Sequence, residues 1–150
     1  MPVNSMEEWK DISRSLSPEM AQAAWKHALK MGGGDRKKAI PYYKLLLETA
    51  MQESKLGKMD AENPMQLTKG TIQDFKNRYG DELKEWAGEG TPLERQMGAA
   101  ALIYRKRLGK RDISSLENRA KAWKETYNTS AGAGTPEKYV RNNKAWKWGD

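Results

Sequence analysis

The chain has 150 residues, no cysteine and a formal net charge of +7, so it has the length of one ordinary domain. The missing cysteines exclude a disulfide framework and a thiol-ligated metal. Because His27 is the only histidine, a two-histidine zinc site is excluded and a Ser-His-Asp triad depends on that residue. Composition therefore leaves carboxylates as the main catalytic candidates, and the basic surface favours polyanionic partners such as nucleic acid, anionic lipid or an acidic cell-wall polymer.

Glycine, proline and helix-capping residues divide the chain into helical segments, and strand-like alternation is almost absent. The motif Ser17-Pro18-Glu19 predicts an N-cap, a first helical residue and a first-turn acid. We therefore predict a mainly α fold, formed as a single domain over residues 1–150. The expected helices run from Pro18 to Met31, from Asp35 or Pro41 to Leu56, from Thr71 to Tyr79 with Gly80 ending it, from Thr91 to Leu108, from Ser114 or Ser115 to Tyr127, and from Thr135 toward Trp148.

The second of these helices carries a glutamate in line with its apolar face. Leu46, Ala50 and Glu53 are separated by four and then three residues, which is the spacing of one helical face. Partial burial and the negative end of the helix dipole both disfavour a carboxylate there, so we expect the pKa of Glu53 to be raised. A raised pKa suits a general acid that works near neutral pH. The alternative is a helix-end glutamate that turns to solvent. The rest of the expected apolar stripe is Ile40, Tyr43 and Leu47.

Three short motifs follow one another in the chain: Glu53-Ser54, Met65-Gln66 before a threonine-bearing helix start, and Tyr127-Asn128 before Gly132. This order resembles the soluble lytic transglycosylase and goose-type lysozyme family, which has a Glu-Ser pair at a helix end, a Gly-Leu-Met-Gln segment and a later Tyr-Asn pair. The resemblance spans about residues 39–140. It departs from the family where Asn63-Pro64 replaces Gly-Leu, where the interval from Glu53 to Gln66 is shorter, and where the glycine after Tyr-Asn is delayed.

The resemblance implies a lysozyme-like fold with a substrate cleft, and cleavage of the β-1,4 bond between N-acetylmuramic acid and N-acetylglucosamine in peptidoglycan. Neither a metal nor an organic cofactor is implied. Glu53 would protonate the glycosidic oxygen and then accept the proton of the muramoyl C6 hydroxyl, which closes a 1,6-anhydro ring. Tyr127 would support Glu53. The full set of supporting or substrate-binding residues that the resemblance implies is Ser54, Met65, Gln66, Tyr127 and Asn128.

Each of these residues also has a simpler interpretation. Tyr127 suits a core aromatic, Asn128 a loop or cap residue, and Met65 a buried residue that fills a gap. Two loop acids, Asp60 and Glu62, are possible second carboxylates, because an inverting hydrolase needs one roughly 6.5–9.5 Å from its acid. If either acid lies at the cleft, we expect a hydrolytic muramidase. If both acids are solvated, we expect the transglycosylase reaction.

Two non-enzymatic classes stay open. The clusters Arg36-Lys37-Lys38 and Arg105-Lys106-Arg107 suit a helical nucleic-acid-binding module, but the cations are spread along the chain and no helix-turn-helix is clear. The other class is a virion structural protein that kept the fold without the activity. We expect a monomer whose partner is the peptidoglycan glycan strand and not nucleic acid. The basic, aromatic segment 138–148 would pack its aromatic residues on the core or contact anionic envelope polymers.

The first ten residues show no apolar stretch of the kind found in a secretory signal peptide. We therefore expect synthesis in the cytoplasm and action on the cell wall. Such an enzyme fits a phage endolysin that a holin releases into the host periplasm, or a virion-associated lysin.

Overall fold

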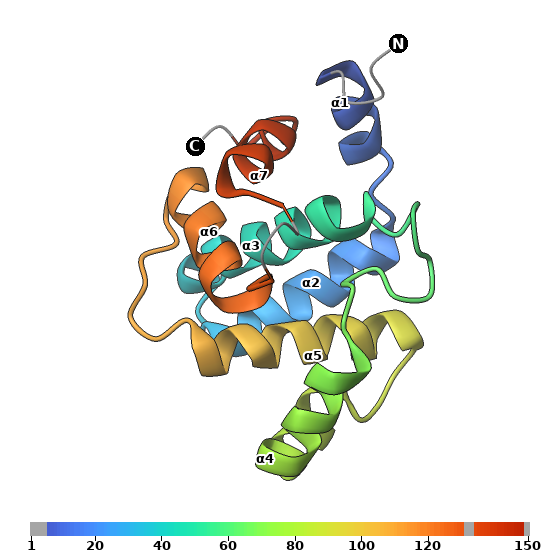
Figure 1. The fold of residues 1–150 in the computed structure, drawn as a ribbon, viewed down its shortest axis with the longest axis vertical. Helices are drawn as coiled ribbons and strands as arrows, with labels where there is room; N and C mark the ends of the chain where they lie inside the picture. Colours follow the sequence, from blue (N-terminus) through green and yellow to red (C-terminus); the bar gives the residue numbers. More distant parts are fainter. Residues whose placement is uncertain (1–5, 131–133, 149–150) are drawn as a thin grey trace.

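The structure is a computed structural model that describes residues 6–130 and 134–148, so Gly132 of the expected motif lies outside them. The described chain is mainly helical, as the sequence predicts, and no strand occurs in it (Figure 1). No helix in these ranges is both long enough and apolar enough to cross a membrane. The elements are α1 (Met6–Arg14), α2 (Pro18–Met31), α3 (Arg36–Ser54), α4 (Lys69–Ala87), α5 (Pro92–Arg107), α6 (Leu116–Ala122), a π-helical turn (Trp123–Tyr127) and α7 (Pro136–Asn143).

Helix α3 is the centre of the fold. Leu45, Leu46 and Leu47 are all fully buried, although consecutive residues of a helix point about 100° apart. Neighbours must therefore cover α3 on several sides. Helix α2 packs along it, α5 lies mainly against α2 and touches α3, and α7 closes the opposite side (Figure 1). Helix α4 packs on α5 and extends away from the rest, while α1 lies beside α7.

The capping residues set the helix starts as the sequence predicts. Ser17 accepts a hydrogen bond from the N–H of Met20 at the start of α2. Thr91 and Glu94 form a reciprocal capping box at the start of α5. Ser115, not Ser114, caps α6. Such caps satisfy N–H groups that have no partner inside a helix, so they fix the boundaries independently of the core.

Helix α4 differs from the prediction at both ends. Thr68 caps it in place of Thr71, because the hydroxyl of Thr68 accepts from the N–H of Thr71. Gly80 does not end it. The backbone leaves helical geometry at Tyr79 (φ −135°, ψ 41°) and then continues as helix to Ala87. A glycine with ordinary negative φ is tolerated inside a helix, and in α4 the irregular residue precedes it.

Two further expectations need correction, and one helix was not expected. Ile40 is 45% exposed, because the start of α3 turns Ala39 toward the core instead. Helix α7 ends at Asn143 and does not continue toward Trp148. Helix α1 was not predicted, although Trp9 and Ile12 stand at helical spacing and are both buried.

Gly98 lies where α5 contacts the end of α4. A Cβ atom at this position would overlap the backbone carbonyl oxygen of Trp86 and would lie 2.9 Å from Cε1 of His27. We expect Gly98→Ala to lower the free energy of unfolding by about 1–3 kcal/mol, because a backbone obstacle cannot rotate away. Urea denaturation measures this, with Gly70→Ala as the matched control because nothing lies within 4 Å of a Cβ there. Equal stability of the two variants would contradict the close packing.

Candidate functional site

Glu53 lies in the last turn of α3, partly buried, and distant parts of the chain hold its carboxylate. The indole Nε1 of Trp123 and the amide Nδ2 of Asn128 both donate to Oε2 of Glu53, each at 3.0 Å. Within the described residues, no donor bonds the other oxygen, Oε1. The two oxygens therefore differ, and Oε1 is the one left to carry a proton.

The surroundings of Glu53 favour its protonated form. Burial raises the pKa of this carboxyl, while the hydrogen bonds from Asn128 and Trp123 and the charge of Lys124 act in the opposite direction without cancelling it. Removal from water penalises a carboxylate more than two neutral donors compensate. The group is thus suited to give up a proton at a higher pH than an exposed glutamate.

The π-helical turn explains how Trp123 and Asn128 reach the same oxygen. The N–H of Asn128 donates to the carbonyl of Trp123 at 2.9 Å, which closes a turn of five residues. In an α-helix, residues five apart point about 140° away from each other. The wider turn brings both side chains toward Glu53, in keeping with the frequent occurrence of π turns at functional sites.

A cavity of about 360 Å³ opens in front of Glu53. The end of α3, the start of α4, the last part of α5 and the segment after the π turn all contribute to its wall. Among the described residues, Glu53 is its one acidic lining residue. Ile103, Leu67 and Tyr127 supply apolar surface. The amide and hydroxyl side chains that line it are those of Gln66, Thr68, Thr71, Asn128, Thr129 and Ser130.

Tyr127 lines this cavity, but its hydroxyl donates to the carbonyl oxygen of Met65 at 2.6 Å. Trp123 and Asn128 therefore provide the support for Glu53 that the resemblance assigned to Tyr127. Met65 itself is fully buried in the core, in agreement with its simpler interpretation. Tyr127 and Met65 thus act by joining two walls of the cavity.

Ser54 is almost completely buried and lies outside the cavity lining. Its hydroxyl is 2.6 Å from the carbonyl of Pro64 and accepts from the N–H of Gly57 at 2.8 Å. These bonds fix the loop that leaves α3, where Lys55 and Leu56 adopt left-handed conformations with φ of 51° and 59°. Ser54 thus holds the loop beside the site and does not reach a ligand in the cavity.

Gln66 lines the cavity, but neither possible second carboxylate does. Asp60 accepts from the N–H of Asn63 and from Nε2 of Gln66, both at 3.0 Å, so it orders its own loop. Glu62 lines a different hollow, between α4 and α5. The structure therefore does not bring either acid to the wall that Glu53 occupies.

A second glutamate of α3, Glu48, is fully buried and was not predicted as a special residue. Arg119 binds it through Nε and Nη2, at 2.8 and 2.9 Å. Tyr139 and Trp148 add hydrogen bonds at 2.8 and 3.1 Å. Burial raises the pKa of Glu48, and these donors oppose that effect. Glu48 is absent from the cavity lining, so it joins α3 to α6, α7 and the segment after α7.

A sequence signal for this ion pair existed. Arg119 stands three residues after Leu116 and four before Trp123, on the apolar face of the helix predicted there. The same reasoning that selected Glu53 selects Arg119, because a charged residue on an apolar face is either functional or paired. The expectation that aromatic residues of the C-terminal segment pack on the core is confirmed by Tyr139 and Trp146, both buried.

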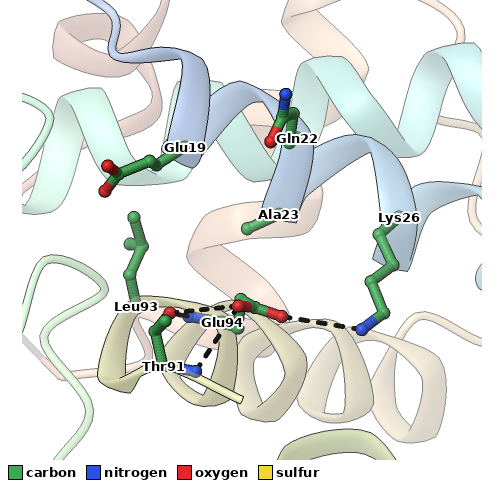
Figure 2. Close-up of a pocket in the computed structure, with 7 residues that line it drawn as sticks. All are labelled: Glu19, Gln22, Ala23, Lys26, Thr91, Leu93 and Glu94. Carbon is green, nitrogen blue, oxygen red and sulfur yellow. Dashed lines mark hydrogen bonds and ion pairs between the residues drawn. The ribbon is translucent and has the colours of Figure 1, made fainter.

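A hollow of about 330 Å³ between α2 and α5 lacks comparable chemistry (Figure 2). Its acid, Glu94, bonds to Thr91 in the capping box and lies 3.6 Å from the ammonium of Lys26. The hydrogen bond from the backbone of Thr91 and the charge of Lys26 lower the pKa of Glu94. Because its lowered pKa favours the ionised form, this carboxyl group is unsuited to donate a proton.

The electrostatics of Glu53 give a prediction that needs no assay of activity. Asn128→Leu keeps the side-chain size but removes a donor to Oε2, so we expect the pKa of Glu53 to rise further. Carbon-13 NMR titration of the Glu53 carboxyl group measures the change. Ser130→Ala is the control, because Ser130 lines the cavity without bonding Glu53. An unchanged or lowered pKa in Asn128→Leu would contradict the assigned hydrogen bond.

No group of three or more histidine, aspartate or glutamate side chains suited to hold a metal ion occurs in the ranges 6–130 and 134–148. Comparison of the chain with models of known families, with curated proteins and with solved structures found no match.

Proposed function

We propose that the protein is a lysozyme-like, peptidoglycan-degrading glycosidase that cleaves the β-1,4 bond between N-acetylmuramic acid and N-acetylglucosamine. One observation carries the proposal. The glutamate that the motif order selects is a partly buried acid with a raised pKa, on the wall of a cavity rich in hydroxyl and amide groups. Sugar-binding sites need such groups, because a sugar presents many hydroxyls that must be hydrogen-bonded. The activity would serve bacterial lysis or wall penetration.

The two oxygens of Glu53 suggest how the reaction would proceed. Oε1 carries the proton and gives it to the glycosidic oxygen as the bond to the muramoyl C1 breaks. The negative charge that remains is stabilised on Oε2 by the N–H groups of Trp123 and Asn128. The carboxylate then takes the proton of the muramoyl C6 hydroxyl, whose oxygen bonds to C1. Glu53 ends protonated, ready for the next cycle, and the product carries a 1,6-anhydro ring.

The lining of the cavity favours this intramolecular reaction over hydrolysis. An inverting hydrolase needs a second carboxylate to activate water. Asp60 orders its own loop and Glu62 lines another hollow, so neither residue is in place for that role. The C6 hydroxyl is attached to the substrate itself and has a large entropic advantage over water from solution.

Product analysis tests the proposal. We expect purified protein to release muropeptides with 1,6-anhydromuramoyl ends from isolated sacculi. Mass spectrometry identifies them, because a hydrolysed product is heavier by one water. Reducing-end products alone would make the protein a muramidase. Release of no muropeptide by the folded protein would overturn the proposed function.

A further inference from the structure

Arg107 is a cation on the wall of the Glu53 cavity that has no acidic partner among the described residues. Its Nη1 donates to the carbonyl of Thr126 at 3.2 Å. Its guanidinium carbon lies over the ring of Phe75, 5.3 Å from the ring centroid. The cation–π contact and the hydrogen bond restrict the guanidinium, while most of its five N–H donors remain for another partner.

The two preceding cations have different surroundings. Lys106 forms an ion pair with Glu82 at 2.8 Å, and Arg105 lies over the ring of Trp86. Neither belongs to the lining of the Glu53 cavity. Cations in the last turn of a helix interact favourably with the helix dipole, and each of these three residues contributes in that way. The dipole does not explain why Arg107 lies in the wall of the cavity.

Arg107 and Glu53 flank the same short stretch of chain. Arg107 bonds the carbonyl of Thr126, and Glu53 accepts from the side chain of Asn128, two residues further on. Tyr127, between them, lines the cavity. A ligand that lies against this stretch would meet the acid at one end and the guanidinium at the other.

We propose that Arg107 binds a carboxylate of the substrate and thereby selects the strand that is placed against Glu53. The proposal rests on the proposed function for the identity of that substrate. A guanidinium binds carboxylates through two parallel hydrogen bonds, which fixes orientation as well as adding affinity. Peptidoglycan offers two sources of this group near the cleaved bond. The lactyl carboxylate of muramic acid is free in strands without peptide, and stem peptides carry carboxylates of their own.

Binding measurements test the proposal separately from catalysis. In a Glu53→Gln background, which prevents turnover, calorimetry measures the Kd for two soluble glycan fragments, one peptide-free and one bearing stem peptides. We expect Arg107→Gln to weaken binding of one of them by about tenfold to a hundredfold. Arg105→Gln is the matched control, since it removes the same charge from the same helix outside the cavity. Equal effects of the two substitutions would overturn the proposal.

Chemical amidation of the fragments gives a second measurement that needs no change at Arg107, so a folding defect in the variant does not obscure the result. We expect protein with Arg107 intact to bind the amidated fragment as weakly as Arg107→Gln binds the original one. A loss confined to the peptide-free strand identifies the lactyl carboxylate, and a loss confined to the peptide-bearing strand identifies the stem. Unchanged affinity for both amidated fragments would also overturn the proposal.

The two proposals fail in different ways. If the unmodified protein releases muropeptides but its affinity for the fragments does not depend on their carboxylates, the role proposed for Arg107 is wrong and the proposed enzymatic function stands. If binding depends on Arg107 and on carboxylates while no muropeptide is released, the carboxylate site stands and the catalytic proposal is wrong.

Discussion

Replacement of Glu53 by glutamine is expected to reduce muropeptide release by about 10²–10⁴-fold, the usual contribution of a positioned general acid. Glutamine keeps the size of the side chain, and its amide oxygen accepts hydrogen bonds from Trp123 and Asn128 as Oε2 does. The variant loses only the proton that the proposed reaction needs. Zymography on purified sacculi, followed by muropeptide quantification, measures the effect. Asp60→Asn and Glu62→Gln are the matched controls, because each removes one loop carboxylate from outside the cavity.

A stability measurement separates lost chemistry from lost folding in the Glu53→Gln variant. The folded protein raises the pKa of Glu53, so it binds the proton more tightly than the unfolded chain does. The stabilisation that this provides is present at low pH and disappears as pH rises through the folded-state pKa. We expect Glu53→Gln to melt at or above the temperature of the unmodified protein at pH 7.5, with a smaller difference at pH 4. A folded, stable variant with full activity would remove Glu53 from the mechanism.

Replacement of Arg119 by methionine is expected to lower the free energy of unfolding by about 3–5 kcal/mol. The change leaves Glu48 fully buried without the two hydrogen bonds from the guanidinium, and burial already disfavours its charge. For a chain of this size, such a loss lowers the melting temperature by roughly 10 °C. Calorimetry or urea denaturation measures it.

Two control variants define that result. Arg78→Met breaks an exposed pair with Asp74, so its effect is expected to stay below about 1 kcal/mol. The double variant Glu48→Leu, Arg119→Met removes both charges and is expected to recover part of the lost stability, because no unpaired ion remains buried. Recovery is partial, since Tyr139 and Trp148 also lose their acceptor. Equal losses in Arg119→Met and Arg78→Met would mean that the buried pair adds nothing.

Local chemistry predicts much of the fold. Ser17, Thr91 and Thr135 predict helix starts, because each side chain accepts a hydrogen bond from the backbone N–H three residues later. The spacing of Leu46, Ala50 and Glu53 was enough to place an acid at the edge of the core. Such patterns depend on neighbours in the chain, so they are readable without the tertiary structure.

The partners of Glu53 were less predictable. Trp123 and Asn128 stand seventy or more residues away in the chain, and their shared direction depends on a π turn. That turn changes the phase of the helix without a proline or glycine to mark it. The buried pair of Glu48 and Arg119 likewise needs two distant helices to be brought together. Sequence patterns indicated which residues face inward but not which of them meet.

The hydrogen bond from Tyr127 to the carbonyl of Met65 has a consequence for motion. It joins the loop that carries Gln66 to the turn that carries Asn128, so the two walls of the cavity share an interaction. An opening fluctuation that moves one wall outward must break this bond or carry the other wall with it. We therefore expect the two walls to move outward as one cooperative unit. A glycan strand bound across the cavity would slow the opening motion of both walls.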